Sequence, residues 1–303
     1  MTALKLGVSL PIITKPEDLA RVGGIGAAAR HVERLGLESA WAADMVLGSG
    51  NHALDAPIVL AAAAAATERI RLGFGTYTLA LRPAAASAAM LASLQQVSGD
   101  RILLGVGSGG FPSAPIWPAV GIPATERGRR TNAILEVLPD LIAGKPTRIG
   151  PDSPEMTLAP ASTVPTILIG GTDAAPTLRR TLAYADEWFP SSMPLSTVIR
   201  GAAKLREMSA EQGRPMPLIT VGGPAVLAGA DIPVEAMTDR LVQAYGIAPD
   251  EAPKIPLTGG PAQIADRLAA FAEAGAHRVV MGLASGDWLR QAEQLAEGYA
   301  LLS

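Results

Sequence analysis

Short hydrophobic runs alternate along the chain with longer segments in which hydrophobic residues recur every three or four positions. The short runs predict β-strands and the longer segments predict amphipathic helices. The expected strands cover residues 4–11, 39–44, 69–80, 101–109, 165–171, 186–192, 217–227 and 277–283. The expected helices cover residues 17–36, 56–67, 84–97, 125–143, 173–185, 195–212, 261–274 and 287–300. Each strand is therefore followed by a helix.

This alternation predicts a parallel sheet, and eight units in 303 residues predict its closure. We expect an α/β fold, a (β/α)8 TIM barrel with loop insertions at its carboxyl-terminal face, forming a single domain over residues 1–303. A doubly wound sheet is the alternative. That fold usually has a glycine-rich phosphate-binding turn after its first strand. Here the segment SLPIITKPEDL follows the first strand, so the barrel is favoured.

Three long connections, 45–55, 110–124 and 223–260, leave the carboxyl ends of expected strands. Barrel enzymes build their sites on that face. Long loops in compact domains are often lids, so segment 223–260 is a candidate lid insertion. Residues 144–165 instead lead from a helix into a strand, and we expect a small hairpin there, on the opposite face.

Composition narrows the function classes. Hydrophobic residues make up 49% of the chain and charged residues 17%, the net charge is −3 and no basic run occurs, which argues against a nucleic-acid surface. The longest apolar block, residues 56–66, is too short to span a bilayer, and the first residues lack the pattern of a signal peptide. We expect a cytoplasmic protein that binds no membrane. With no cysteine and three unclustered histidines, we expect no metal site.

Glycines mark the candidate binding positions. In RIRLGFGTYTLALRP, residues 69–83, the sequence Gly75-Thr76-Tyr77 interrupts a buried strand, which indicates a bulge or a close approach of the backbone to a ligand. Gly170, Gly171 and Thr172 end another strand just before a helix and form a candidate phosphate seat. The alternative is a glycine turn in which Thr172 or the next residue, an aspartate, merely caps the helix.

Among the histidines, His52 follows the second strand on the site face and is a candidate for lining a pocket. His31 lies in a helix, and His277 precedes the last strand at the opposite end of the barrel. We expect both to be structural.

Five collinear segments resemble the bacterial luciferase-like family. They are HVERLGLESAWAADM, ATERIRLGFGTYTLALRP, VSGDRILLGVGSGG, ERGRRTNAILEVLPDLIAG and VPTILIGGTDAAPTLRRTLAYADEWFP. That family comprises FMN-dependent monooxygenases and oxidoreductases that use the deazaflavin coenzyme F420. The resemblance is good over residues 4–190 and loose beyond them.

The resemblance implies specific positions in this chain. The family's third strand has a bulge, often with a non-prolyl cis peptide, behind the flavin ring; it falls at Gly75–Thr76 here, with Tyr77 nearby. Asp44 matches an acidic residue beside the ring, so Asp44 and His52 are the candidate proton carriers. The phosphate side of the cofactor would lie at two further groups of residues: Ser108 and Gly109, and Gly170, Gly171 and Thr172.

The chain departs from the family at informative places. Met45 stands where the F420-dependent sugar-phosphate dehydrogenases have a histidine, and Gly110 stands where they have a glutamate, so sugar-phosphate oxidation is disfavoured. The arginine that binds FMN phosphate in luciferase-type members has no counterpart in GSGGFPSAPIW, which favours F420 over FMN. The candidate substrate wall is apolar, and so favours a hydrophobic substrate: Trp41, Met45, Phe111 and Trp117.

Three hypotheses follow. The first is an F420-dependent oxidoreductase that transfers hydride between the coenzyme and a hydrophobic small organic substrate. The second is an FMNH2-dependent two-component monooxygenase supplied by a separate reductase. The third is a non-catalytic flavin-binding accessory homologue, favoured by Met45 and Gly110. The family also implies a homodimer through the helices at 56–67 and 84–97.

Overall fold

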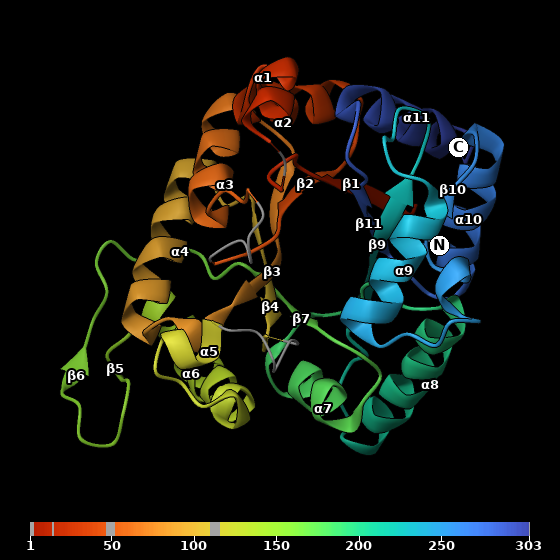
Figure 1. Cartoon of the computed structure of the whole chain (residues 1–303). Coiled ribbons are helices and arrows are strands. Elements are labelled where there is room, and N and C mark those ends of the chain that lie inside the picture. The colour runs from red at the N-terminus through yellow and green to blue at the C-terminus, as the bar shows by residue number, and fades with distance from the viewer. Residues whose placement is uncertain (1–2, 14, 47–51, 110–115, 303) are drawn as a thin grey trace.

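The computed structural model describes residues 3–13, 15–46, 52–109 and 116–302. Eight parallel strands close into a barrel (Figure 1). The strands are β1 (Lys5–Ser9), β2 (Ser39–Ala42), β3 (Arg71–Thr78), β4 (Ile102–Gly107), β7 (Thr166–Gly170), β8 (Glu187–Phe189), β9 (Leu218–Val226) and β11 (Arg278–Leu283). They pair in chain order, and β11 closes the ring between β9 and β1. The predicted (β/α)8 barrel is confirmed.

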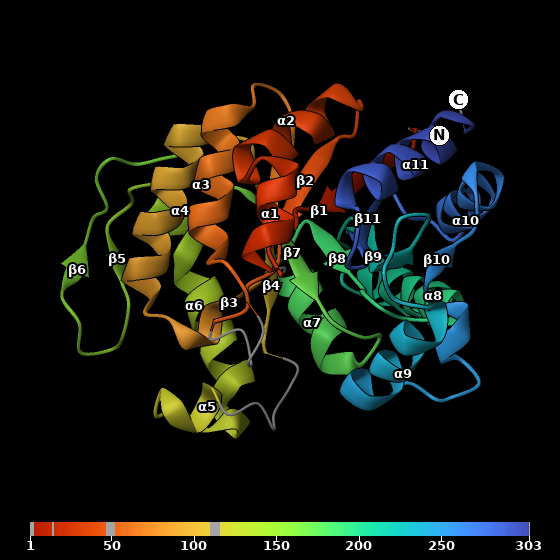
Figure 2. The ribbon, with the colours of Figure 1, turned by 45° about the horizontal axis from the view of Figure 1, so that its top comes forward.

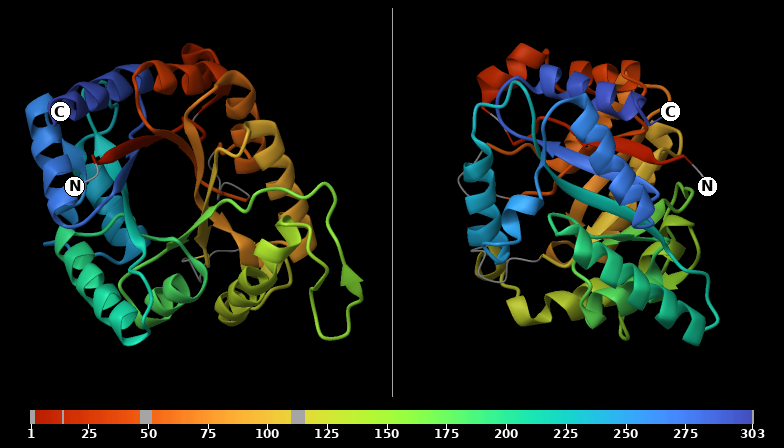
Figure 3. Two further views of the ribbon diagram at one scale, coloured as in Figure 1. Left: turned by 180° about the vertical axis from the view of Figure 1, so that it is seen from behind. Right: turned by 90° about the vertical axis from the view of Figure 1, so that its right-hand side faces the viewer.

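Helices surround the barrel, as Figure 3 shows from behind. They are α1 (Pro16–Val22), α2 (Ile25–Arg34), α3 (Ala56–Ala66), α4 (Ala84–Ser98), α5 (Ile116–Ala119), α6 (Arg127–Ile142), α7 (Ala175–Tyr184), α8 (Leu195–Glu211), α9 (Val234–Tyr245), α10 (Pro261–Glu273) and α11 (Trp288–Ala300). The expected single helix over 17–36 is wrong. It is split into α1 and α2 because Gly23 and Gly24 have φ values of 81° and 84°, outside the helical region.

The two insertions contain structure of their own. The expected hairpin is confirmed: β5 (Thr147–Arg148) and β6 (Glu155–Met156) pair antiparallel and project beyond α4 and α6 (Figure 1). The candidate lid contains α9, a short 3-10 helix (Ala252–Lys254) and β10 (Leu257–Thr258), which extends the sheet beside β9. Figure 2 places α9 and α5 at the same end of the barrel. The lid role itself stays a prediction.

Two hydrophobic cores result from the closure. The larger core lies between the strands and the helices. The smaller core is inside the barrel and consists of Trp41, Leu103, Leu168, Phe189 and Val280. Because side chains alternate along a strand, every second residue faces inward, and the interior is built in layers. Gly73 makes room for the Trp41 ring, which lies where a Cβ at that position would stand.

Over the described residues, no helix combines the length and the apolar character needed to cross a lipid bilayer.

Candidate active site at the carboxyl ends of the strands

A bulge interrupts β3 at the predicted position. The register between β3 and β4 shifts between Phe74 and Tyr77, and the peptide bond Gly75–Thr76 is cis. Gly75 lines the cavity at the carboxyl end of the barrel, and Thr76 also faces inward, toward Gly107. Two successive residues of one strand therefore point into the barrel.

The bulge corrects the prediction for Tyr77. With two inward residues before it, Tyr77 is turned outward, where a regular alternation after Phe74 would place it inside. Its ring packs on Phe74 with centroids 5.0 Å apart, and the Arg82 guanidinium lies 4.3 Å from its centroid. Burial raises the pKa of the Tyr77 phenol. Tyr77 therefore supports the bulge from behind and does not face the cavity.

Thr76 links the bulge to the two following strands. A Cβ added at Gly107 would collide with Oγ1 of Thr76, and one added at Gly170 would lie 2.8 Å from its Cγ2. The structure thus brings the predicted residues Thr76 and Gly170 together, and adds Gly107. Any larger residue at either glycine would displace Thr76.

The cavity at this end has a volume of about 210 Å³. Trp41 and Phe189 form its floor, with ring centroids 5.3 Å apart and an interplanar angle of 58°. Its residues come from six strands and the loop after β8: Ser9, Trp41, Gly75, Phe189, Ser191, Ser192, Gly222, Gly223, Pro224, Val280, Gly282 and Leu283. Among the described residues that line it, none has a charged side chain, and the polar groups are serine hydroxyls, the Trp41 indole N–H and backbone.

Two glycines from different strands, Gly75 and Gly282, face this space. A Cβ at Gly75 would lie 3.5 Å from its nearest neighbour, in Trp41, and one at Gly282 would lie 3.8 Å from the carbonyl oxygen of Gly223. These are ordinary contacts, so the protein leaves room at both positions. Small residues let a ligand approach the backbone closely. The two glycines form a cradle that suits the face of a flat ring.

Asp44 is held as a structural link. Its side chain is 1% exposed, and both carboxylate oxygens accept hydrogen bonds from Arg82, at 2.7 and 2.8 Å. It also accepts a hydrogen bond from the backbone N–H of Thr78 at 2.9 Å. The contact raises the pKa of Arg82 despite its burial, which acts to lower it. The predicted role of Asp44 as proton carrier is disfavoured, because a carboxylate so engaged lacks a free oxygen for a substrate proton.

The other predicted residues fall in different environments. His52 is exposed just before α3, and Met45 is partly buried after β2. Trp117 is 2% exposed and packs against Gly109, so it is enclosed by the protein and does not form an open wall. Trp41 is part of the cavity floor, below the expected ring. Phe111 and Gly110 lie outside the described residues.

The predicted phosphate seat has a defined electrostatic setting. Trp188 donates a hydrogen bond to the Gly171 carbonyl at 3.1 Å, and the Ala174 N–H donates to Thr172 at 3.3 Å. The neighbouring Asp173 pairs with Arg200 at 2.7 Å and Lys204 at 2.8 Å. The Arg200 hydrogen bond holds the pKa of Asp173 below its usual value. Two cations against one carboxylate leave a net positive charge beside these glycines.

Sequence reasoning missed several residues of this cavity. Ser9 lies two residues beyond Gly7 on one inward face of β1, so alternation alone marks it once the inward face of β1 is known. Phe189 on β8 and Ser191 just beyond it are also two residues apart, so alternation places both on the inward side of the barrel. Ser192 has φ 56° and carried no comparable signal in the sequence. Within the described ranges, no group of three histidines and carboxylates could hold a metal ion.

The fold is shared with several solved structures. An F420-dependent secondary alcohol dehydrogenase, solved with an F420–acetone adduct, superposes with a TM-score of 0.79 at 17% identity, over 99% of each chain. The FMN-bound oxygenating component of 3,6-diketocamphane monooxygenase, a type II Baeyer–Villiger monooxygenase of Pseudomonas putida, superposes with a TM-score of 0.74 at 15% identity, over 99% of this chain and 98% of the other.

Sequence comparison gives the family. An uncharacterised protein of Mycobacterium tuberculosis is 30% identical over 216 residues, which are 67% of this chain and 73% of the relative. The sequence model of the luciferase-like monooxygenases matches residues 6–254. With the barrel and its bulged third strand, this match shows that the chain belongs to the luciferase-like monooxygenase family of oxidoreductases.

Proposed function

We propose that the protein is an F420-dependent oxidoreductase that transfers hydride between coenzyme F420 and a hydrophobic small organic substrate. The observation that carries the proposal is the cradle of Gly75 and Gly282 above the Trp41–Phe189 floor. Binding sites for whole cofactors usually enclose roughly 300–1,000 Å³. A cavity of about 210 Å³ therefore suits the ring of the cofactor, with its side chain outside.

The residues present fit such a ring. Gly75 would support one face through its backbone, while the hydroxyls of Ser9 and Ser191 are available to its polar edge. Thr76 and the Asp44–Arg82 pair would hold the bulge in place. The phosphate side of the cofactor would lie along Ser108 and Gly109 and along Gly170, Gly171 and Thr172, near the excess positive charge of Arg200 and Lys204.

Bound coenzyme F420 would supply a carbon that accepts or donates hydride. The protein would exclude water and orient the substrate above the ring. We place Met45 beside the substrate and keep Phe111 in the proposed apolar wall, which the enclosed Trp117 does not join. Segment 223–260, which includes α9, would act as the lid. Because both oxygens of Asp44 are engaged, His52 remains the candidate proton carrier.

A titration tests the cofactor. Trp41 lies in the cavity floor, so tryptophan fluorescence should change when a ring binds. We expect F420 to bind in the micromolar range and FMN at least about tenfold more weakly, a difference of about 1.4 kcal/mol. The reverse order would replace the proposal with the FMNH2-dependent monooxygenase and its reductase partner, which the FMN-bound structural neighbour supports. No binding of either would leave only an accessory homologue that has lost the cofactor as well as the chemistry.

A single methyl group tests the cradle. Gly75→Ala should fold, since its Cβ would meet Trp41 at 3.5 Å, but the methyl would occupy space under the ring. We expect F420 affinity to fall by about tenfold or more. Gly150→Ala is the control, because a Cβ there meets nothing within 4 Å and Gly150 lies far from the cavity in sequence and strand order. Unchanged affinity in Gly75→Ala would mean that the ring binds elsewhere.

We also propose a homodimer through α3 and α4. These adjacent helices contain no charged residue, and Ile58 and Val97 on them are 70% and 60% exposed. An uncharged face of this kind commonly marks an interface. We expect sedimentation to give a dimer and Ile58→Glu to give a monomer. A monomeric wild type would contradict the assignment.

A further inference from the structure

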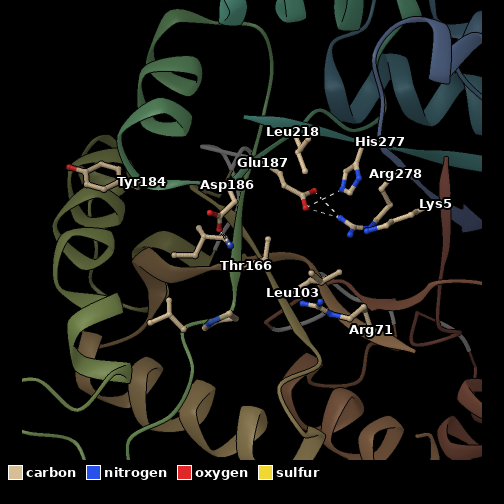
Figure 4. Close-up of a pocket in the computed structure, with 13 residues that line it drawn as sticks. Lys5, Arg71, Leu103, Thr166, Tyr184, Asp186, Glu187, Leu218, His277 and Arg278 are labelled. Atoms are coloured by element: carbon tan, nitrogen blue, oxygen red, sulfur yellow. Dashed lines mark hydrogen bonds and ion pairs between the residues drawn. The ribbon is translucent and has the colours of Figure 1, made fainter. Parts of the chain in front are cut away.

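The amino-terminal end of the barrel contains a second and larger cavity, of about 620 Å³ (Figure 4). Its lining begins where the strands begin: Lys5 opens β1, Arg71 opens β3 and Arg278 opens β11. Lys5 and Ser9 share the inward face of β1, so Lys5 lies in the lowest interior layer, at the opposite end from the candidate active site. Nothing in the proposed redox function uses this cavity.

Three cations follow one arc of the barrel wall. Strand register places Lys5 on β1 beside Arg278 on β11. Arg71 on β3 lies beside Ser39 on β2, and β2 separates β3 from β1. Arg278 is satisfied: it donates to Glu187 at 2.8 Å and to Glu38 at 3.0 Å. In the part of the chain that the structure describes, neither Lys5 nor Arg71 forms an ion pair.

Arg71 is only partly satisfied. Its Nε and Nη2 donate to the carbonyls of Arg101 and Ile102, both at 3.2 Å, and neither acceptor carries a charge. Burial lowers the pKa of the Arg71 guanidinium, against the weaker effect of more distant carboxylates. A half-buried cation that forms no ion pair gains when an anion approaches it.

The charge count favours an anion. Lys5, Arg71 and Arg278 carry three positive charges, and the carboxylates bonded to Arg278, Glu38 and Glu187, carry two. Asp186 also lines the cavity, but it is exposed at the rim, where solvent screens its charge. Among the buried and half-buried groups of this end the positive charges exceed the negative ones by one, and only the exposed Asp186 balances them.

Apart from Thr166 and His277, the rest of the lining is apolar or aromatic. Leu103, Val164, Pro165, Ile167, Leu218 and Tyr184 all contribute to it. Figure 4 shows the side chains of Lys5 and Arg71 directed toward the space that Leu103 and Leu218 also border. A ligand with one anionic group and a small apolar body matches both parts of the lining.

We propose that the amino-terminal mouth of the barrel is a second binding site, for a small organic anion. Its carboxylate or phosphate group would bind Lys5 and Arg71, and its apolar part would contact Leu103 and Leu218. Charged hydrogen bonds to the guanidinium would supply most of the specificity. The site is independent of the proposed cofactor, so either assignment can fail alone.

Calorimetric titration with benzoate and with inorganic phosphate tests the proposal. We expect benzoate to bind with a Kd of about 1 mM or lower, and phosphate more weakly because it lacks an apolar body. If phosphate binds better than benzoate, the site recognises phosphate groups and the apolar contacts are overturned. No heat from either anion up to about 10 mM would overturn the site itself.

Two variants locate the binding. Lys5→Gln removes one cation that has no ion pair in the described structure, so folding should be unaffected, and benzoate affinity should fall about tenfold. Arg71→Gln should have a similar or larger effect. Gly75→Ala, at the other end of the barrel, is the matched control and should leave benzoate affinity unchanged. Benzoate binding that Gly75→Ala abolishes and Lys5→Gln spares would contradict the proposal.

Discussion

The two mouths of this barrel are built from the same strands but from opposite kinds of residue. At the carboxyl end, Gly75 and Gly282 face a cavity whose polar groups, over the described residues, are neutral. At the amino end, Glu187 and Arg278 lie in a buried network of charges. The inward positions of β3 show the change along one strand: Arg71 is followed by Gly73, whose space Trp41 fills, and then by Gly75.

The difference shows where each end obtains its rigidity. The amino end is held by side-chain hydrogen bonds, since Arg278 contacts Glu38, Glu187 and Thr220 directly. The carboxyl end is held from outside the cavity, where Asp44 and Arg82 fix the backbone after the bulge. Support from behind leaves the surface free for a ligand. Removing a charged side chain at the amino end should therefore have different consequences from removing one at the carboxyl end.

The largest effect is expected at Arg278. Arg278→Met would leave Glu187, whose side chain is 3% exposed, without its cation, and breaking such a buried pair typically costs about 3–5 kcal/mol. Urea unfolding measures the loss. Arg129→Met is the control, because Arg129 is 76% exposed where it meets Glu126, and about 1 kcal/mol or less is expected there. If cofactor affinity falls in the folded Arg278→Met protein, the two ends of the barrel are energetically coupled and do not act separately.

The next effect is a loss of stability in acid. Burial acts to raise the pKa of Glu187, but the hydrogen bond from His277, the charge of Arg278 and the hydrogen bond from Thr220 outweigh it and lower the pKa to about 2, from 4.5. The folded pKa lies below the unfolded one, so the stabilisation is complete above about pH 4.5 and is lost as the pH falls toward 2. A shift of this size corresponds to about 3 kcal/mol.

Unfolding free energies of wild type and Glu187→Gln between pH 7 and 3 isolate this contribution. Other carboxylates titrate in both proteins, so the difference between the two curves belongs to Glu187. The difference in unfolding free energy between wild type and Glu187→Gln should become smaller as the pH falls. A difference that stays constant with pH would show that the network does not stabilise the charge of Glu187.

A smaller change in stability, but a clear change in binding, is expected at Arg82. Lysine keeps the charge yet cannot bind both oxygens of Asp44. We expect Arg82→Lys to lower stability by about 1–2 kcal/mol and F420 affinity several-fold, because the backbone after Thr76 would be less well held. Equal affinity in wild type and variant would show that this ion pair supports only the fold.

Most of the architecture and part of the site could be predicted from the sequence. Alternation of strands and helices was enough for the barrel. The glycine within a hydrophobic strand indicated a bulge or a close backbone approach, and the resemblance to the family placed the bulge at Gly75 and Thr76. The break between α1 and α2 was missed because the helical pattern continues across Gly23 and Gly24, whose conformation decides it. The outward position of Tyr77 does not follow from the sequence, because a bulge with two inward residues reverses the alternation that follows.

The remaining features depend on contacts between distant parts of the chain. Arg82 and Asp44 are 38 residues apart, and no spacing rule predicts their ion pair. The excess charge at the amino-terminal mouth appears only when Lys5, Arg71 and Arg278 are brought into one layer by closure of the barrel. Residue type indicates what each group can do, but the register of the strands decides which groups meet.

The smallest effect is expected at His277, and it separates the causes of the low Glu187 pKa. The His277 ring lies 3.3 Å from Glu187, at the long end of the range for a hydrogen bond, while Arg278 and Thr220 contact the same carboxylate more closely. His277→Ala should cost about 1 kcal/mol or less at pH 7. It should also move the acid-induced loss of stability to higher pH, because one of the interactions that lower the Glu187 pKa is removed. An acid transition at the wild-type pH would assign the low pKa to Arg278 and Thr220 alone. A loss of stability as large as that of Arg278→Met would instead show that His277 stabilises Glu187 as strongly as Arg278 does.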